Sequence, residues 1–273
     1  QDSNYFILGP HVRQFEADFA SFCQTKHCIG VASGLDALQL GLRALDVGKG
    51  DEIIVPSNTY IATVIAADLV SAKAVFVEPN PESYNIDPAK IEAAITPNTK
   101  VIMPVHLYGQ ICEMDAIMTI AKKHNLHVIE DNAQSQGATW NGKPSGSFGT
   151  LNATSFYPSK NIGALGDGGA ITGDDDAFID KVRALRNYGS HKKYYNEYIG
   201  INSRLDEIHA AALSIKLKWL HKWNAQRQKI AKMYDTDLAG VGDLTLPKTV
   251  AGATHVYHIY QIRTKKRDEL QAH

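Results

Sequence analysis

The feature that most constrains the fold is a repeated alternation of short apolar runs with segments of helical hydrophobic spacing. The apolar runs are typical of strands and lie at residues 28–32, 52–56, 73–78, 100–106, 127–131, 153–157 and 169–172. Between several of them the spacing predicts helices at residues 35–46, 59–71, 88–95, 113–124 and 175–187. Strands that alternate with helices predict an α/β fold with a mostly parallel sheet, flanked by helices on both faces.

Longer helical patterns lie at both ends of this alternation. Residues 11–23 predict an amphipathic helix, and residues 203–238 predict one long helix. The segment "THVYHIYQIRT" at 254–264 predicts the first strand of a second domain. We therefore expect a large domain over 1–238 and the start of a smaller C-terminal domain over 239–273. Because the chain ends soon after that strand, we expect this small domain to be truncated.

The charge balance limits the class of ligand. The chain has 28 Lys and Arg residues against 29 Asp and Glu residues, so no overall basic field attracts nucleic acid or an anionic membrane. A phosphate-bearing ligand must therefore be bound by local groups. The cysteines, Cys23, Cys28 and Cys112, have no C-x-x-C spacing and predict neither disulfides nor a metal site. With no apolar run of transmembrane length and no signal-peptide pattern, we expect a cytoplasmic protein.

The segment "SFYPSKNIGALGDGG" places Lys160 directly after a predicted strand, in a loop of small residues. Most lysines are solvated on the surface, and Lys160 could be one of these. A loop of this composition can instead approach a flat ligand closely and turn its lysine inward. A lysine near a cationic or apolar group loses proton affinity and becomes a usable nucleophile.

Three other segments lie at predicted strand ends, where open parallel sheets bind ligands. In "VASGLDAL", Gly34 opens a helix whose free N–H groups could bind an anion, or it forms only a tight turn. In "VIEDNAQSQGA", Asp131 could cap the next helix or face a cationic group, which Gln134 could also reach. In "PSNTYIAT", Tyr60 could belong to the core or stack on a flat ligand.

Taken together, these groups fit pyridoxal phosphate. Asp131 would pair with the pyridine nitrogen and keep it protonated, so that the ring can accept electrons. Gln134 would hold the phenolic oxygen. Lys160 would form the Schiff base and then move the proton between the substrate and cofactor carbons. The phosphate would be bound by the hydroxyl of Ser155 and the N–H groups of Gly34 and Leu35.

These segments and "GINSRLDEIHAA" resemble, in order and spacing, the nucleotide-sugar aminotransferases of the DegT/DnrJ type over nearly the whole chain. The resemblance implies a fold-type I pyridoxal-phosphate-dependent transferase with Lys160 as its Schiff-base lysine. It also implies a homodimer with shared active sites, in which Asn202 or Arg204 reaches the phosphate of the neighbouring subunit. Many members have Asn where Arg204 falls and Thr where Leu35 stands. Because Leu35 lacks a hydroxyl, one phosphate contact must come from elsewhere.

Within the family, the first glycine loop and "GINSRLDEIHAA" resemble most the enzymes that aminate C3 of dTDP-3-keto-6-deoxyhexoses. The implied reaction takes the amino group from L-glutamate and gives a dTDP-3-amino-3,6-dideoxyhexose and 2-oxoglutarate. The segment "RNYGSHKKYYNEY" is either a solvated basic turn or a clamp in which Lys192 or Lys193 binds the diphosphate. His106 is either a buried structural histidine or a substrate contact, and Tyr157 is a further substrate candidate.

Other functions compete with this prediction. One is a 4-aminotransferase that acts on a nucleotide-4-keto-6-deoxysugar. Another keeps the fold and cofactor but catalyses the dehydration used for some 3-deoxysugars. The resemblance implies a histidine at the lysine position in those enzymes, and Lys160 argues against this reaction. An NAD-dependent oxidoreductase would need the glycines of "GALGDGGA" to open a helix, but they lead towards a predicted strand. The intact Lys160, Asp131 and Gln134 disfavour a regulatory protein that only retains the fold.

Overall fold

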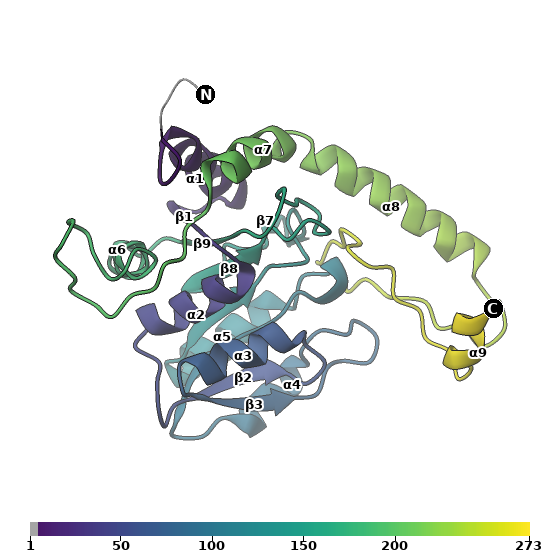
Figure 1. Cartoon of the computed structure of the whole chain (residues 1–273). Coiled ribbons are helices and arrows are strands. Elements are labelled where there is room, and N and C mark those ends of the chain that lie inside the picture. Colours follow the sequence, from purple (N-terminus) through teal and green to yellow (C-terminus); the bar gives the residue numbers. More distant parts are fainter. Residues whose placement is uncertain (1–4) are drawn as a thin grey trace.

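The computed structural model describes residues 5–273. Its core is a seven-stranded sheet with the order β1-β9-β8-β5-β4-β2-β3 (Figure 1). Strands β8, β5, β4, β2 and β3 are parallel, whereas β9 pairs antiparallel with both β1 and β8. These strands are β1 (His27–Val31), β2 (Glu52–Pro56), β3 (Lys73–Val77), β4 (Thr99–Ile102), β5 (His127–Asp131), β8 (Leu151–Ser155) and β9 (Gly169–Gly173). The predicted mostly parallel sheet is confirmed.

Helices cover both faces of this sheet. Strand residues alternate between the faces, so that Ile53 packs in one core with α2, α3 and α6, while Ile54 packs in another with α4 and α5. A third core joins α1 and α7 near β1 and β9. The helices are α1 (Pro10–Cys23), α2 (Gly34–Ala44), α3 (Ile61–Leu69), α4 (Pro88–Ile91), α5 (Met114–His124), α6 (Asp176–Leu185), α7 (Glu207–Leu217), α8 (Leu220–Asp237) and α9 (Arg267–Ala272).

Shorter elements connect these helices and strands. Two single-turn 3-10 helices and a small two-stranded sheet lie between them, at η1 (Glu92–Ala94), η2 (Leu107–Gly109), β6 (Thr139–Trp140) and β7 (Lys143–Pro144). The strand predicted at 100–106 ends at Ile102, and the strand predicted at 153–157 ends at Ser155. Beyond these ends only isolated contacts continue, such as the bridge between Val105 and Asp131.

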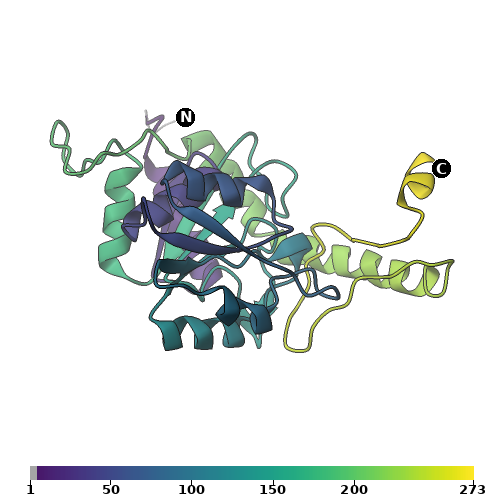
Figure 2. The ribbon, with the colours of Figure 1, turned by 90° about the horizontal axis from the view of Figure 1, so that it is seen from below.

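The long helix predicted over residues 203–238 is wrong in its extent, because it is divided into α7 and α8. The break lies at Lys218 and Trp219, where the backbone of Trp219 has φ −104° and ψ −9°. The two helices follow different surfaces. Helix α7 packs against α1, whereas α8 extends away from the sheet together with residues 239–273 (Figure 2). The division into domains at residue 238 stays a prediction.

The strand predicted at 254–264 is also wrong. This segment makes only isolated bridges, between His255 and Gln110 and between Arg263 and Thr245. Tyr257 has φ +47°, which is incompatible with a continuous strand. Among the described residues no neighbouring strand pairs with this segment, and two side chains of α8 donate hydrogen bonds to its backbone carbonyls. None of the helices within residues 5–273 combines the length and the apolar character needed to span a membrane.

Candidate active site

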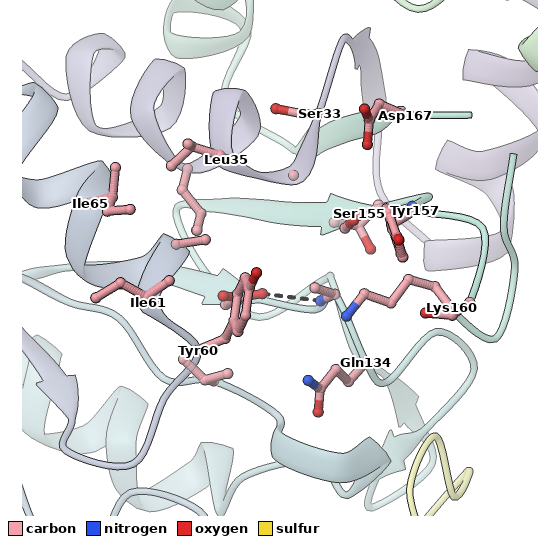
Figure 3. A pocket seen from close by; sticks show the side chains of 18 residues that line it. Ser33, Leu35, Tyr60, Ile61, Ile65, Gln134, Ser155, Tyr157, Lys160 and Asp167 are labelled. Atoms are coloured by element: carbon pink, nitrogen blue, oxygen red, sulfur yellow. Dashed lines mark hydrogen bonds between the residues drawn. The ribbon is translucent and has the colours of Figure 1, made fainter.

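A cavity of about 660 Å³ lies beyond the carboxyl ends of the parallel strands (Figure 3). Its walls come from the loops that follow β1, β2, β4, β5 and β8, which is where open parallel sheets bind ligands. Eight of the residues predicted from the sequence line this cavity: Gly34, Leu35, Tyr60, Asp131, Gln134, Ser155, Tyr157 and Lys160. Loops that are distant in the sequence therefore meet at one site.

Asp131 ends β5 and lies at the base of the cavity with 7% of its surface exposed. One carboxylate oxygen accepts from the Thr63 hydroxyl at 3.0 Å, and the other accepts from the Ala133 N–H at 3.1 Å. Burial raises the pKa of Asp131, although these hydrogen bonds and the charge of Lys160 act in the opposite direction. A buried carboxylate is costly unless a cation pairs with it. The site therefore fits a protonated ring nitrogen.

Lys160 approaches the cavity from the loop after β8, opposite α3. Figure 3 shows its side chain and that of Tyr60 pointing toward one another, with Gln134 on another side. Burial lowers the pKa of Lys160, while the charge of Asp131 raises it. The charge of each of these two groups shifts the pKa of the other, so the two charges interact within this cavity. A lysine with a lowered pKa is suited to proton transfer.

The end of the cavity nearest α2 has the form of an anion site. Ser33 caps α2 by accepting from the Asp36 N–H at 3.1 Å. Gly34 and Leu35 are the first two residues of the helix, and their N–H groups have no partner within it. A Cβ on Gly34 would lie 2.6 Å from the Cβ of Ser155. Only glycine allows Ser155 to approach this helix N-terminus so closely, which fits a phosphate bound by both.

Gln134 is oriented by the turn that contains η2. Its Oε1 accepts from the Tyr108 N–H at 2.6 Å, and Tyr108 itself has φ +59°. Since the amide oxygen is used in this way, the amide nitrogen is the group that can donate to a ligand. This orientation fits a hydrogen bond to a phenolic oxygen.

His106 does not line the cavity, so the structure does not support the predicted substrate contact. Its ring is fully buried, with Nε2 2.7 Å from Glu130 Oε2 and Nδ1 accepting from the Cys112 N–H at 3.2 Å. Glu130 and Asp131 are consecutive in β5 and therefore point to opposite faces of the sheet. Burial would raise the pKa of Glu130, but hydrogen bonds from His106 and from backbone N–H groups lower it below its ordinary value.

The remaining predicted residues also lie outside the cavity of their own chain. Arg204 donates from Nη1 to Asn187 Oδ1 at 3.1 Å, and Asn202 forms an isolated bridge with Asn187. Lys192 and Lys193 are exposed in the loop between α6 and α7 and lie over tyrosine rings of that same loop. The contact of Asn202 or Arg204 with the phosphate of a neighbouring subunit stays a prediction, as does the binding of the substrate diphosphate by Lys192 or Lys193.

Several residues in and around the site were not predicted from the sequence. Thr63 binds Asp131 from the first turn of α3, and its position three residues after Tyr60 in a predicted helix was the available signal. The other cavity residues that were missed are Ser33, Leu38, Ile61, Ala62, Ile65, Val105, Ala133, Thr154, Ser159 and Asp167. Most are apolar or small, and nothing in the local sequence distinguishes them from core residues. Within residues 5–273 no three His, Cys, Asp or Glu side chains form a metal-binding group.

Comparison with known proteins places this geometry in a family. The model of the DegT/DnrJ/EryC1/StrS aminotransferase family matches residues 1–273. The dTDP-3-amino-3,6-dideoxy-alpha-D-galactopyranose transaminase of Aneurinibacillus thermoaerophilus is 54% identical over 270 residues, which are 99% of this chain and 74% of that protein. The dTDP-3-amino-3,4,6-trideoxy-alpha-D-glucose transaminase of Streptomyces venezuelae is 47% identical over 272 residues, 100% of this chain and 72% of that protein.

Among solved structures, S. venezuelae DesV in complex with a ketimine intermediate matches with a TM-score of 0.98 at 48% identity. The match covers 100% of this chain and 73% of that one. The described fold is thus shared with this structure over the whole chain. The chain belongs to the DegT/DnrJ/EryC1/StrS aminotransferase family and is a pyridoxal-phosphate-dependent sugar aminotransferase.

Proposed function

We propose that this enzyme transfers the amino group of L-glutamate to C3 of a dTDP-3-keto-6-deoxyhexose. The products are a dTDP-3-amino-3,6-dideoxyhexose and 2-oxoglutarate. The observation that carries the proposal is the meeting of Lys160, Asp131 and Gln134 at one cavity. The names of two relatives, at 54% and 47% identity, support the choice of a dTDP-linked 3-amino sugar.

Each end of the cavity has groups that suit one part of the cofactor. When bound, pyridoxal phosphate supplies a ring that accepts the electron pair of the broken substrate bond. Asp131 would hold a proton at the ring nitrogen, and the Gln134 amide nitrogen would donate to the phenolic oxygen. Ser155 and the N-terminus of α2 would bind the phosphate. Tyr60, which is 69% exposed at the cavity wall, would lie against the ring.

Lys160 would carry the proton during the transfer. In its neutral form, Nζ would take the proton from the substrate carbon and then give it to the cofactor carbon. Burial lowers the pKa of Lys160, so the neutral form is more accessible than for a surface lysine. Asp131 opposes this shift and keeps the ammonium form available for the return of the proton.

We also place a second copy of the chain over α3. Ile61, Ile65 and Leu69 are four residues apart and therefore lie on one face of this helix, with 57%, 38% and 49% of their surfaces exposed. Ile61 and Ile65 also line the cavity, so a subunit that covers this apolar face would close the site. In such a homodimer the partner's Asn202 or Arg204 would reach the phosphate.

The proposal is tested by the structure of the product. We expect NMR to show an amino group at C3 when the enzyme, cofactor and L-glutamate are mixed with a panel of dTDP-, UDP- and GDP-linked keto sugars. A product aminated at C4 would show that the substrate is a 4-keto sugar and not the proposed 3-keto sugar. The roles proposed for the cofactor-binding residues would not change. Formation of no amino sugar from any member of the panel would overturn the proposal.

A further inference from the structure

Behind the cavity, the buried side-chain amides of Asn161, Asn224 and Gln136 form hydrogen bonds that connect α8 with two loops, and we call them the amide network. Asn224 on α8 accepts from Asn161 Nδ2 at 2.9 Å and donates from its own Nδ2 to the backbone carbonyl of Gln136 at 2.9 Å. The Gln136 amide donates to Thr154 Oγ1 at 3.2 Å and to the Ser155 carbonyl at 2.9 Å. Gln136 is fully buried, and Asn161 and Asn224 are 5% exposed.

The amide network joins the loops that form the cavity. Asn161 directly follows Lys160, and Gln136 lies in the loop that begins at Asp131. Ser155, at the end of β8, belongs to the wall that suits the phosphate. Since Asn224 bonds to two of these loops at once, α8 is their common anchor, although no residue of the helix lines the cavity.

The local backbone leaves room for this contact. Gly137 has φ +91°, and a Cβ at that position would lie 2.7 Å from Asn224 Nδ2. The network is nevertheless not optimal for stability, because Gln136 Oε1 and Asn161 Oδ1 are buried without a hydrogen-bond partner within residues 5–273. Each unsatisfied buried acceptor destabilises the folded chain, because it loses its hydrogen bonds to water. An apolar filling would avoid this cost, so the amides are better explained by the geometry that they impose.

We propose that Asn224 is a positioning residue that, through Asn161 and Gln136, fixes where the Lys160 amine lies relative to the Asp131 carboxylate. The inference rests on the proposed function only in its use of Lys160 as the proton carrier. Loss of the Asn224 amide removes the hydrogen bonds that connect the Lys160 loop with the Asp131 loop through α8. Small displacements of reacting groups have large effects on rate.

The test compares Asn224→Leu with Gln228→Leu. Gln228 is also on α8, and its Nε2 donates to the His255 carbonyl at 3.0 Å, so the control removes a bond from the same helix to a segment outside the cavity. In the cofactor-loaded enzyme we expect Asn224→Leu to lower kcat about 10- to 100-fold, with less than about a twofold change in KM. We expect Gln228→Leu to change kcat by less than about twofold.

A second readout needs neither cofactor nor substrate. Burial lowers the pKa of Lys160, so the pH midpoint at which an amine-directed reagent modifies Lys160 should lie below that of surface lysines. Peptide mass spectrometry of the labelled full-length chain measures this midpoint. In Asn224→Leu the loosened loop admits water, and the midpoint should rise by about half a unit or more. In Gln228→Leu the midpoint should not move.

The outcomes separate this inference from the proposed function. Wild-type kcat and an unchanged labelling midpoint in Asn224→Leu would overturn the positioning role. Equal losses of kcat in both variants would also overturn it, because the effect would then be structural. If Asn224→Leu does not fold, Asn161→Ala breaks the same bond from the Lys160 loop. If the wild type transfers no amino group but the midpoints differ as expected, the positioning role stands and the proposed function fails.

Discussion

The segments before the cavity loops form strands, whereas the C-terminal segment 239–273, for which a strand was also predicted, forms none. The apolar runs before Asp131 and Ser155 pair with neighbouring strands on both sides, and their last residues are thereby fixed at one edge of the sheet. The segment "THVYHIYQIRT", which is rich in β-branched and aromatic residues, has no such pairing. Such a composition marks a backbone suited to pairing, whereas the presence of a partner strand decides whether a strand forms.

The C-terminal segment is held by side chains as well as by isolated backbone hydrogen bonds. Arg227 donates to the Tyr257 carbonyl at 3.1 Å, and Asn161 donates to the Val256 carbonyl at 3.1 Å. The rings of His255 and Tyr257 stack with centroids 3.9 Å apart. In the cavity, polar side chains such as Asp131 and Lys160 face a ligand site, whereas here polar side chains hold the chain in place. Substitutions in the two regions should therefore affect different properties.

The largest effect is expected for Lys160→Ala. Loss of the proton carrier should lower kcat by about 10⁴-fold or more, with little change in stability. The matched control is Lys100→Ala, which removes an exposed lysine of β4 and should retain activity. Turnover of L-glutamate and the keto sugar measures both. Borohydride reduction of the holoenzyme should label Lys160, and a label on another lysine would refute this assignment.

Asp131→Asn should lower kcat by about a hundredfold or more, because a neutral amide does not keep the ring nitrogen protonated. The same variant should be no less stable than the wild type. Burial raises the pKa of Asp131, so the ionised carboxylate of the ligand-free protein opposes folding at neutral pH. Steady-state kinetics and urea unfolding of the ligand-free protein measure the two effects. Near-normal turnover would remove Asp131 from its proposed role.

Glu130→Gln tests the other face of β5. This variant should lower the free energy of unfolding and have a smaller effect on kcat than Asp131→Asn. Glu130 accepts hydrogen bonds from His106 and from the N–H groups of Gly146, Phe148 and Gly149. An amide at this position presents a donor to these donors and should lower the free energy of unfolding by about 3 kcal/mol. Urea unfolding measures the loss. An unchanged free energy of unfolding, or a kcat per folded enzyme as low as that of Asp131→Asn, would contradict this division of roles.

The smallest effect concerns pH and the C-terminal segment. Burial lowers the pKa of His255 to about 3, so below about pH 6.5 the unfolded chain binds a proton that the folded chain does not. Stability should therefore fall as pH decreases from 6.5, by up to about 1.4 kcal/mol per pH unit from this residue. His255→Gln should flatten this dependence in unfolding measurements at pH 7 and pH 5. An identical slope in both proteins would show that His255 is not responsible.

The sequence by itself determined the parts that depend on local periodicity and local chemistry. Apolar runs and helical spacing predicted the strands and helices of the sheet region, because each element needs only its own side-chain pattern to show which face is buried. The glycine-rich loop of Lys160, the strand-end Asp131 and the α2 start at Gly34 were predicted in the same way, and all three line the cavity.

Only the tertiary structure decided the features that depend on contacts between distant residues. It showed that His106 binds Glu130 on the other face of β5, and that Thr63 binds Asp131. It also divided α7 from α8 and left residues 254–264 without a partner strand. Local sequence carries no record of these choices, because each depends on which surface another part of the chain presents after folding.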